Sequence, residues 1–400
     1  MKKTEKAFIE LLSSHINDTV NISDDNPDWD EIYTLSKDHN LSGMIYLAIN
    51  KLNIKPDKEL YVRLSQAYFH TIAVSVNRDA EYEKVKEIFF DNKIPYIQVK
   101  GIALAEYYPV KEVRTMGDVD LVIRLEDKEK VLKLFTDKGY KSKTGSREDW
   151  TYYNDIINLE MHTDLCPEQI SASIDPTAYF KNIWEMTNDT DDCFKELKPE
   201  YHLIFLLIHL AKHIYGFGAG VRQIMDISIL LKHFNNQINW GLIEKDLEKL
   251  NMTKFAKNIF YLCNDWFGTQ FPFELEMDQD TYELICRYIF EGGVFGFKAR
   301  NSVAEIKLRK EIDNNKGRYS KKAPIKAFLK LFVIDKQDLY ASVPFTKRHP
   351  FLLPIGWVYR IFRGVFSGRK RERHKAYISG LSSKRQEAQS NYDIMKKIGL

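Results

Sequence analysis

Acidic residues at two places in the chain have the spacing that a divalent metal site requires. Asp118 and Asp120 stand two apart in the segment GDVDLVI, and Glu160 stands in NLEMH. The alternation of these acids with apolar residues predicts two β-strands. Side chains two apart on a strand point to the same face, so Asp118 and Asp120 form a clamp while Val119 and Leu121 turn into the core.

This carboxylate cluster predicts magnesium binding. Neighbouring carboxylates repel one another unless a cation neutralises them, and their hard oxygen ligands suit Mg²⁺ carried by the phosphates of a nucleotide. Two-metal sites commonly recruit a third carboxylate, for which Glu160 is the candidate, both as a metal ligand and as the group that takes the proton from an attacking hydroxyl. His162 shares its face of the strand. We therefore expect two Mg²⁺ ions and an NTP substrate.

Nucleotide-binding candidates lie upstream of the acids. Lys100 and Gly101 end the β-prone run IPYIQVKG and open a predicted helix, where free backbone N–H groups and the helix dipole favour a triphosphate. Lys100 and Arg114 would add positive charge, and Gly117 directly precedes the acidic pair. Taken alone, Gly101 is better explained as a plain turn glycine.

The D-x-D pattern is also found in proteins of other classes. With 56 acidic residues in 400, two acids at this spacing arise by chance about eight times. The sequence DVDLV also fits the nucleophile motif of haloacid-dehalogenase-like phosphatases and the D-x-D of sugar-nucleotide glycosyltransferases. In those folds a hydrophobic strand precedes the acids, whereas here RTMG precedes them and the strand follows. A solvated strand edge is the remaining structural alternative.

Two further pairs of polar residues have helical spacing. His209 and His213 could both ligate zinc, but the sequence HLAKH lacks the Glu of H-E-x-x-H, so we favour packing between helices. Arg222 and Asp226 are also four apart, which predicts an ion pair along one helix worth a few tenths of a kcal/mol.

The surrounding sequence predicts an α+β fold, in which a small mixed-sheet core is flanked by helical regions at both ends. Apolar residues recur at helical spacing in the first part, strands then alternate with helices, and helical spacing returns afterwards. We divide the chain into an N-terminal helical region, an α/β core, a C-terminal helical domain and a basic amphipathic segment, at residues 1–90, 91–200, 201–345 and 346–400.

Charge is distributed unevenly. Residues 347–400 hold 13 Lys and Arg against 3 Asp and Glu, although the whole chain carries only +3. Aromatic residues such as Phe351, Trp357 and Tyr359 are interleaved with these cations, which include Arg369, Lys370, Arg371 and Arg373. This pattern predicts contact with an anionic membrane or with nucleic acid. A second possibility is that the segment crosses the domain body and buries its aromatic residues while its cations meet substrate phosphate or RNA. The alternative that we favour is a structural return helix with a solvated end.

Cysteine usage and hydropathy point to the cytoplasm. The four cysteines form no C-x-x-C pair, which argues against a zinc site or a disulfide framework. The N-terminus lacks the apolar run of a signal peptide, and the longest apolar stretch, residues 203–210, is far shorter than the ~20 residues that cross a bilayer.

The segments KGIALAEYYP and VRTMGDVDLVI resemble an uncharacterised bacterial nucleotidyltransferase family of the polymerase-beta-like superfamily, with its K-G-x-A-L and R-x-M-G-D-h-D-h signature. The resemblance extends through HLIFLLIHLAKH and RHPFLLPIGWVYRIFRG, and covers most of the chain after about residue 70. It implies metal ligation by the three carboxylates, Gly101 in the nucleotide loop and Asp226 facing the active site. The chain departs from the superfamily at Ile102, where a second small residue is usual.

The function implied is Mg²⁺-dependent transfer of a nucleoside monophosphate from an NTP such as ATP to a hydroxyl-type acceptor, with release of pyrophosphate. The acceptor is a protein, a small molecule, a lipid-linked sugar or an RNA. The alternative is a non-catalytic nucleotide-binding or regulatory protein that retains the fold.

Overall fold

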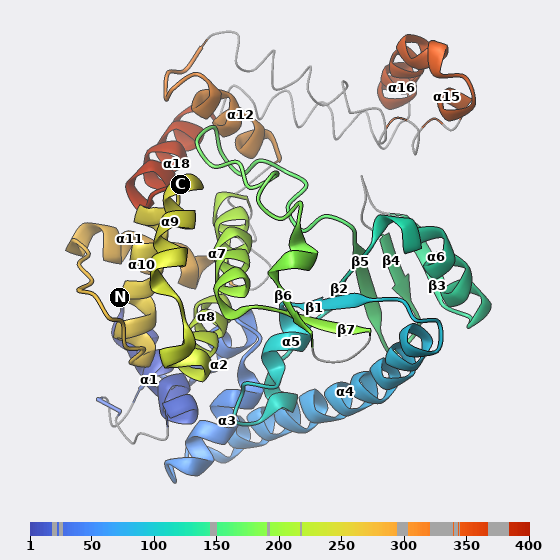
Figure 1. The fold of residues 1–400 in the computed structure, drawn as a ribbon. Helices are drawn as coiled ribbons and strands as arrows, with labels where there is room; N and C mark the ends of the chain where they lie inside the picture. Colours follow the sequence, from blue (N-terminus) through green and yellow to red (C-terminus); the bar gives the residue numbers. More distant parts are fainter. Residues whose placement is uncertain are drawn as a thin grey trace.

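A single mixed β-sheet with helices on both faces forms the centre of the molecule (Figure 1). The computed structural model describes residues 1–17, 22–23, 27–144, 150–189, 193–216, 218–293, 303–320, 339, 343, 345–366 and 384–400. The predicted α+β class is confirmed.

Within the described residues, the sheet has seven strands in the order β3-β4-β5-β2-β1-β7-β6. Their bounds are β1 (Tyr96–Val99), β2 (Val119–Ile123), β3 (Lys141–Thr144), β4 (Trp150–Tyr153), β5 (Asn158–His162), β6 (Thr187–Asp189) and β7 (Phe194–Leu197). Strand β2 is central, antiparallel to β1 and parallel to β5. The register pairs Asp120 with Val99 on one side and with Glu160 on the other. Paired residues on neighbouring strands point to the same face, so the register itself brings the two acids together.

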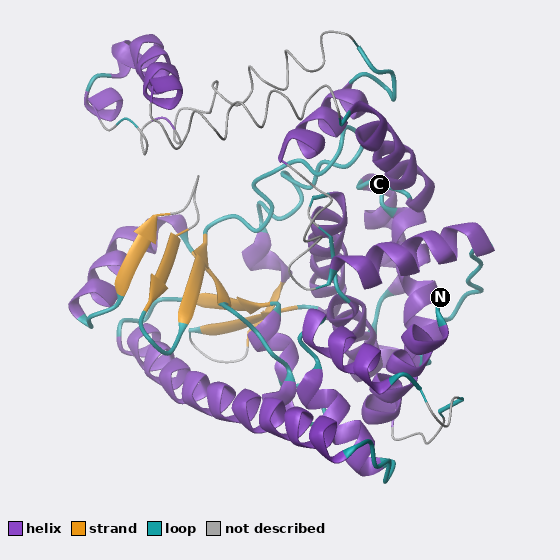
Figure 2. Ribbon diagram, turned by 180° about the vertical axis from the view of Figure 1, so that it is seen from behind, coloured by secondary structure: helices purple, strands orange, loops and turns teal. Residues whose placement is uncertain are grey.

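One face of the sheet is covered by α4 (Lys58–Asp91) and α6 (Lys128–Asp137). Helix α4 begins where the Asp57 carboxylate accepts hydrogen bonds from the backbone N–H groups of Glu59 and Leu60. Its last turns pack against the sheet, and its first turns lie against the N-terminal helices (Figure 2). The contacts on this face come from alternate residues of β2, among them Val119 and Leu121. The acids of β2 must therefore face the other way.

The opposite face of the sheet meets the larger helical layer. That layer contains α1 (Lys3–Asn17), α2 (Trp29–Asp38), α3 (Ser42–Lys51), α5 (Gly101–Ala105), α7 (Pro199–Tyr215), α8 (Val221–Phe234), α9 (Trp240–Lys249), α10 (Thr253–Phe267) and α11 (Gln279–Gly292). Helix α7 has Pro199 in its first turn and is apolar over most of its surface, which suits a helix buried between the sheet and other helices. All four cysteines are buried.

The end of the chain contributes α12 (Val303–Asn314), α15 (Phe345–Arg348), α16 (Leu353–Phe366) and α18 (Arg385–Ile398). Helix α18 packs on α12 and buries Met395 and Ile398 in the main core. In contrast, Phe351, Ile355 and Tyr359 are exposed. The interpretation in which this segment crosses the body and buries its aromatic residues is therefore wrong for Phe351 and Tyr359.

The cluster of Arg369, Lys370, Arg371 and Arg373 lies outside the described residues. Within the described part of the chain, no helix combines the length and the apolar character needed to span a bilayer.

Candidate active site

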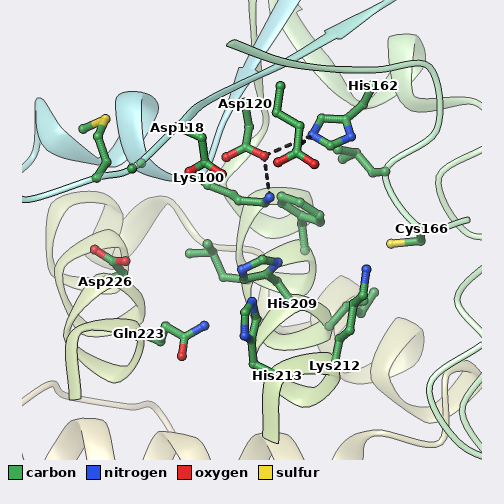
Figure 3. Close-up of a pocket in the computed structure, with 18 of the residues that line it drawn as sticks. Lys100, Asp118, Asp120, His162, Cys166, His209, Lys212, His213, Gln223 and Asp226 are labelled. Atoms are coloured by element: carbon green, nitrogen blue, oxygen red, sulfur yellow. Dashed lines mark hydrogen bonds and ion pairs between the residues drawn. The ribbon is translucent and has the colours of Figure 1, made fainter. Parts of the chain in front are cut away.

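A cavity of about 450 Å³ lies between helices α7 and α8 and the face of the sheet that meets the larger helical layer (Figure 3). The sheet side presents carboxylates, and the helical side presents histidines and basic groups. The acidic, basic and histidine residues that line the cavity are Lys100, Arg114, Asp118, Asp120, Glu160, His162, Glu168, His209, Lys212, His213, Arg222 and Asp226. Every site residue predicted from the sequence, including Gly101 and Gly117, lines this cavity.

The acidic side of the cavity is built on β2 and β5. Asp120 is buried on β2 beside its register partner Glu160, and Asp118 stands just before the strand begins, where it is more accessible to solvent. Asp120, Glu160 and His162 each offer a ligand atom, and these atoms all lie within 4.8 Å of one another. Asp118 lies outside this closest group but borders the same cavity.

The three carboxyl groups differ in their electrostatic state. Desolvation within the cavity raises the pKa of Asp118 and of Glu160, and the charge of Asp120 raises both further. Burial acts in the same direction on Asp120, but Lys100 and His162 outweigh it and hold the pKa of Asp120 well below its usual value. Asp120 is thus a firm anion, whereas Asp118 and Glu160 are anions that a nearby cation would relieve.

Lys100 is the cation closest to this cluster. Its Nζ donates to Asp120 Oδ1 at 2.5 Å, and His162 Nε2 lies 3.0 Å from the same oxygen. Burial alone would lower the pKa of Lys100, but Asp120, Glu160 and Asp118 together raise it. Lys100 also has a positive φ of 55°, a conformation that side chains other than glycine rarely adopt and that concentrates at functional sites. Its side chain therefore neutralises an acid in this structure.

Arg114 is engaged in a buried bidentate ion pair. Its Nε and Nη2 donate to the two carboxylate oxygens of Asp226 at 3.1 and 2.8 Å, and Tyr108 donates its hydroxyl proton to the same carboxylate at 2.5 Å. Arg222 instead donates Nη1 to the carbonyl and the hydroxyl of Thr115. The predicted ion pair between Arg222 and Asp226 is wrong, because a planar guanidinium from another segment satisfies both oxygens of this carboxylate.

The two glycines of the site have different surroundings. A Cβ on Gly101 would lie 2.7 Å from Arg114 Nη1, so the absence of a side chain there lets the guanidinium pass. A Cβ on Gly117 would meet nothing within 4 Å. Helix α5, which Gly101 opens, has only five residues, so its dipole is a smaller source of anion affinity than the sequence suggested.

Helix α7 supplies a wall that sequence reasoning missed. His209, Lys212 and His213 line the cavity opposite the carboxylates (Figure 3). The two imidazoles contact each other edge to face with ring centroids 4.5 Å apart, and both also border the cavity, which the predicted packing between helices did not include. Burial and then Lys100 lower the pKa of both, to about 4 for His213. In the sequence HLAKH, Lys212 and His213 follow His209 by three and four positions, which places all three side chains on one face of a helix.

The comparison with family models matches residues 25–268 to a family described as uncharacterised nucleotidyltransferase. The matched region includes the whole sheet and the lining of the cavity. No curated protein and no solved structure matches the chain. The family match covers more than half of the sequence and agrees with the resemblance seen in the motifs, and we conclude that this chain belongs to the uncharacterised nucleotidyltransferase family.

Proposed function

We propose that this protein is a Mg²⁺-dependent enzyme that transfers a nucleoside monophosphate from an NTP to a hydroxyl-type acceptor and releases pyrophosphate. The observation that carries the proposal is the convergence of Asp118, Asp120 and Glu160 on one cavity of a chain that belongs to a nucleotidyltransferase family. The acceptor is a protein, a small molecule, a lipid-linked sugar or an RNA.

The residues present fit divalent magnesium. Three carboxylates face one cavity, and the pKa values of Asp118 and Glu160 are raised by desolvation and by the neighbouring charge of Asp120. These three side chains would hold two Mg²⁺ ions through hard oxygen ligands. When bound, Mg²⁺ would stabilise the charge that develops on the phosphates during in-line displacement.

Glu160 is the proposed proton acceptor. Its side chain is half-buried on β5, and burial with the charge of Asp120 raises its pKa above that of an ordinary glutamate. A carboxylate with a raised pKa is a stronger base, and it can accept a proton from an acceptor hydroxyl within hydrogen-bond reach. Asp120 cannot serve as well because Lys100 and His162 stabilise its anion.

The wall of α7 and α8 is proposed to bind the phosphates. Lys212 is exposed, and its ammonium group has no hydrogen bond or ion pair with the residues that the structure describes. Arg222 contributes a second cation from α8, and its Nε is buried without a partner among those residues. We therefore add Lys212 and Arg222 to the nucleotide-binding candidates Lys100, Gly101, Arg114 and Gly117. Lys212 lies across the cavity from the acids (Figure 3), where the polyphosphate of a metal-bound NTP would extend.

The test combines turnover with binding. The purified chain is incubated with Mg²⁺ and each labelled NTP in turn, pyrophosphate is assayed, and candidate acceptors are examined by mass spectrometry. Wild type should release pyrophosphate, and the double variant Asp118→Ala with Asp120→Ala should lose both turnover and Mg²⁺-NTP binding. Glu196→Gln is the matched control, because Glu196 is a half-buried acid on β7 that lines a different pocket.

Two outcomes would contradict the proposal. Equal binding of Mg²⁺-NTP by wild type and the double variant would remove the metal assignment. Binding without turnover for any acceptor would favour the alternative, a non-catalytic nucleotide-binding or regulatory protein. Contact of the basic segment 346–400 with an anionic membrane or nucleic acid stays a prediction, which vesicle and RNA binding by the full chain would test.

A further inference from the structure

We propose that His162 is a direct ligand of the catalytic metal, so that one position of this site favours a first-row transition metal ion such as Mn²⁺ over Mg²⁺. The inference rests on the proposed function and deepens it. It adds a nitrogen ligand to a metal site predicted from carboxylates alone, and this ligand changes which metal ion the site favours.

The separations between the side-chain atoms fit one ion. His162 Nε2 lies 3.0 Å from Asp120 Oδ1 and 4.0 Å from Glu160 Oε2. Two ligands bound at about 2.1 Å to a six-coordinate ion are about 3.0 Å apart when adjacent and about 4.2 Å apart when opposite. The two observed separations match these values, and all three ligand atoms lie within 4.8 Å of one another.

The backbone holds these side chains in place. His162 and Glu160 stand two apart on β5, and the parallel pairing with β2 sets Glu160 beside Asp120 and His162 beside Val122. Asp120 and His162 are only 3% and 8% exposed, so few other rotamers are open to them. Figure 3 shows the His162 ring directed toward the carboxylate of Asp120. Ligands fixed by paired central strands form a more rigid site than ligands on loops.

Without a metal ion, His162 Nε2 and Lys100 Nζ both contact the Asp120 carboxylate, at 3.0 and 2.5 Å from its Oδ1. A neutral imidazole protonated at Nδ1 would offer the lone pair of Nε2 to an ion held by the same carboxylates. Imidazole nitrogen is a favourable ligand for transition metals, whereas Mg²⁺ prefers oxygen and retains water. A mixed set of one nitrogen and several carboxylate oxygens is therefore suited to Mn²⁺.

The decisive experiment is pulsed electron paramagnetic resonance of Mn²⁺ bound to the purified full chain without nucleotide. Wild type should show electron spin echo modulation from a directly bound ¹⁴N nucleus, and labelling the histidines with ¹⁵N should change its frequency. His162→Gln should abolish the modulation. His209→Gln should retain it, because His209 lines the same cavity from α7.

Calorimetry gives a second measurement. His162→Gln should weaken Mn²⁺ binding at least tenfold but Mg²⁺ binding less than about threefold, because only the transition metal gains from nitrogen. Thermal unfolding checks that the variant folds, and wild-type Mn²⁺ spectra test the idea without any variant.

The inference fails if Mn²⁺ does not bind wild type, if the bound ion shows no nitrogen modulation, or if the modulation persists in His162→Gln. In any of these cases, pyrophosphate release with Mg²⁺ would leave the proposed function intact. Nitrogen coordination without turnover of any NTP would instead support the metal site and contradict the proposed function.

Discussion

At the residue scale, the site is defined by which charges are paired within the protein and which face the cavity. Lys100 pairs with Asp120, and Arg114 pairs with Asp226. Both cations were expected to meet a nucleotide, yet each compensates a buried carboxylate. Removal of one partner from a buried pair is costly because the other charge is left in a poorly solvated place.

Lys100→Met should therefore destabilise the protein by about 2–4 kcal/mol, since the buried charge of Asp120 loses its ammonium partner. The pKa of Asp120 should rise toward its usual value. Added Mg²⁺ should stabilise the variant more than wild type, because the ion no longer competes with Lys100. Urea unfolding with and without Mg²⁺ measures both effects. Lys111→Met, which breaks an exposed pair with Glu106, should lose less than about 1 kcal/mol. An equal loss of unfolding free energy in the two variants would show that the Lys100–Asp120 pair contributes no more to stability than an exposed ion pair.

At the element scale, the junction of β1 with α5 and the exposed face of α7 shape the cavity. The junction passes close to Arg114 at Gly101, and α7 brings His209, Lys212 and His213 across from β2 and β5. Neither arrangement follows from a single element. Each arises where one element packs against another.

Gly101→Ala should cost about 1–3 kcal/mol, because the new Cβ would be 2.7 Å from Arg114 Nη1 and must displace a guanidinium held by Asp226. Gly117→Ala should change stability by less than about 0.5 kcal/mol, because its Cβ would meet no atom within 4 Å. Thermal unfolding of the two variants makes the comparison. A smaller loss at Gly101 than at Gly117 would rule out the packing role.

Lys212→Met tests the phosphate wall. The variant should bind an NTP and inorganic triphosphate about tenfold more weakly, since one charged contact to phosphate is lost, while binding of the monophosphate should change little. Isothermal titration calorimetry measures each dissociation constant. Lys245→Met, at an exposed position on α9, is the control. An unchanged preference for triphosphate over monophosphate would exclude Lys212 from the phosphate site.

At the scale of the whole molecule, buried histidines join distant parts of the chain. His39 follows α2 and accepts a hydrogen bond at Nδ1 from the backbone N–H of Val221, which begins α8. Its ring also contacts Phe8 and Phe290. Burial lowers the pKa of His39 from 6.5 to about 4. Protonation of Nδ1 would remove an acceptor that connects the N-terminal helices to the helical layer beside the site.

The stability of the protein should therefore fall in mild acid. The folded-state pKa of His39 lies below the unfolded value, so the unfolded state binds protons first as pH drops. The contribution of His39 is complete above about pH 6.5 and is lost progressively between pH 6.5 and 4. Urea unfolding at several pH values should show this decline, and His39→Gln should reduce its slope. Because His15 and His202 have similarly lowered pKa values of about 4, the variant should retain part of the decline. An unchanged slope in His39→Gln would remove His39 as a contributor.

The sequence by itself determined the strands that carry Asp120 and Glu160 and the face to which both point, because the alternation of side chains along a strand is a local property. Motif spacing also placed Asp118 and Gly101 beside them. The three-residue group of Asp120, Glu160 and His162 needed the parallel register of β2 with β5, which only the folded sheet sets.

Only the tertiary structure decided the partners of the charged residues and the opposite wall of the cavity. Arg114 pairs with Asp226, which lies 112 positions away in the chain. The face of α7 that carries His209, Lys212 and His213 borders the site because the helix packs across the sheet. A charge buried away from water is stable only beside an opposite charge. Which residue supplies that opposite charge depends on long-range contacts of the fold, and no local sequence pattern encodes those contacts.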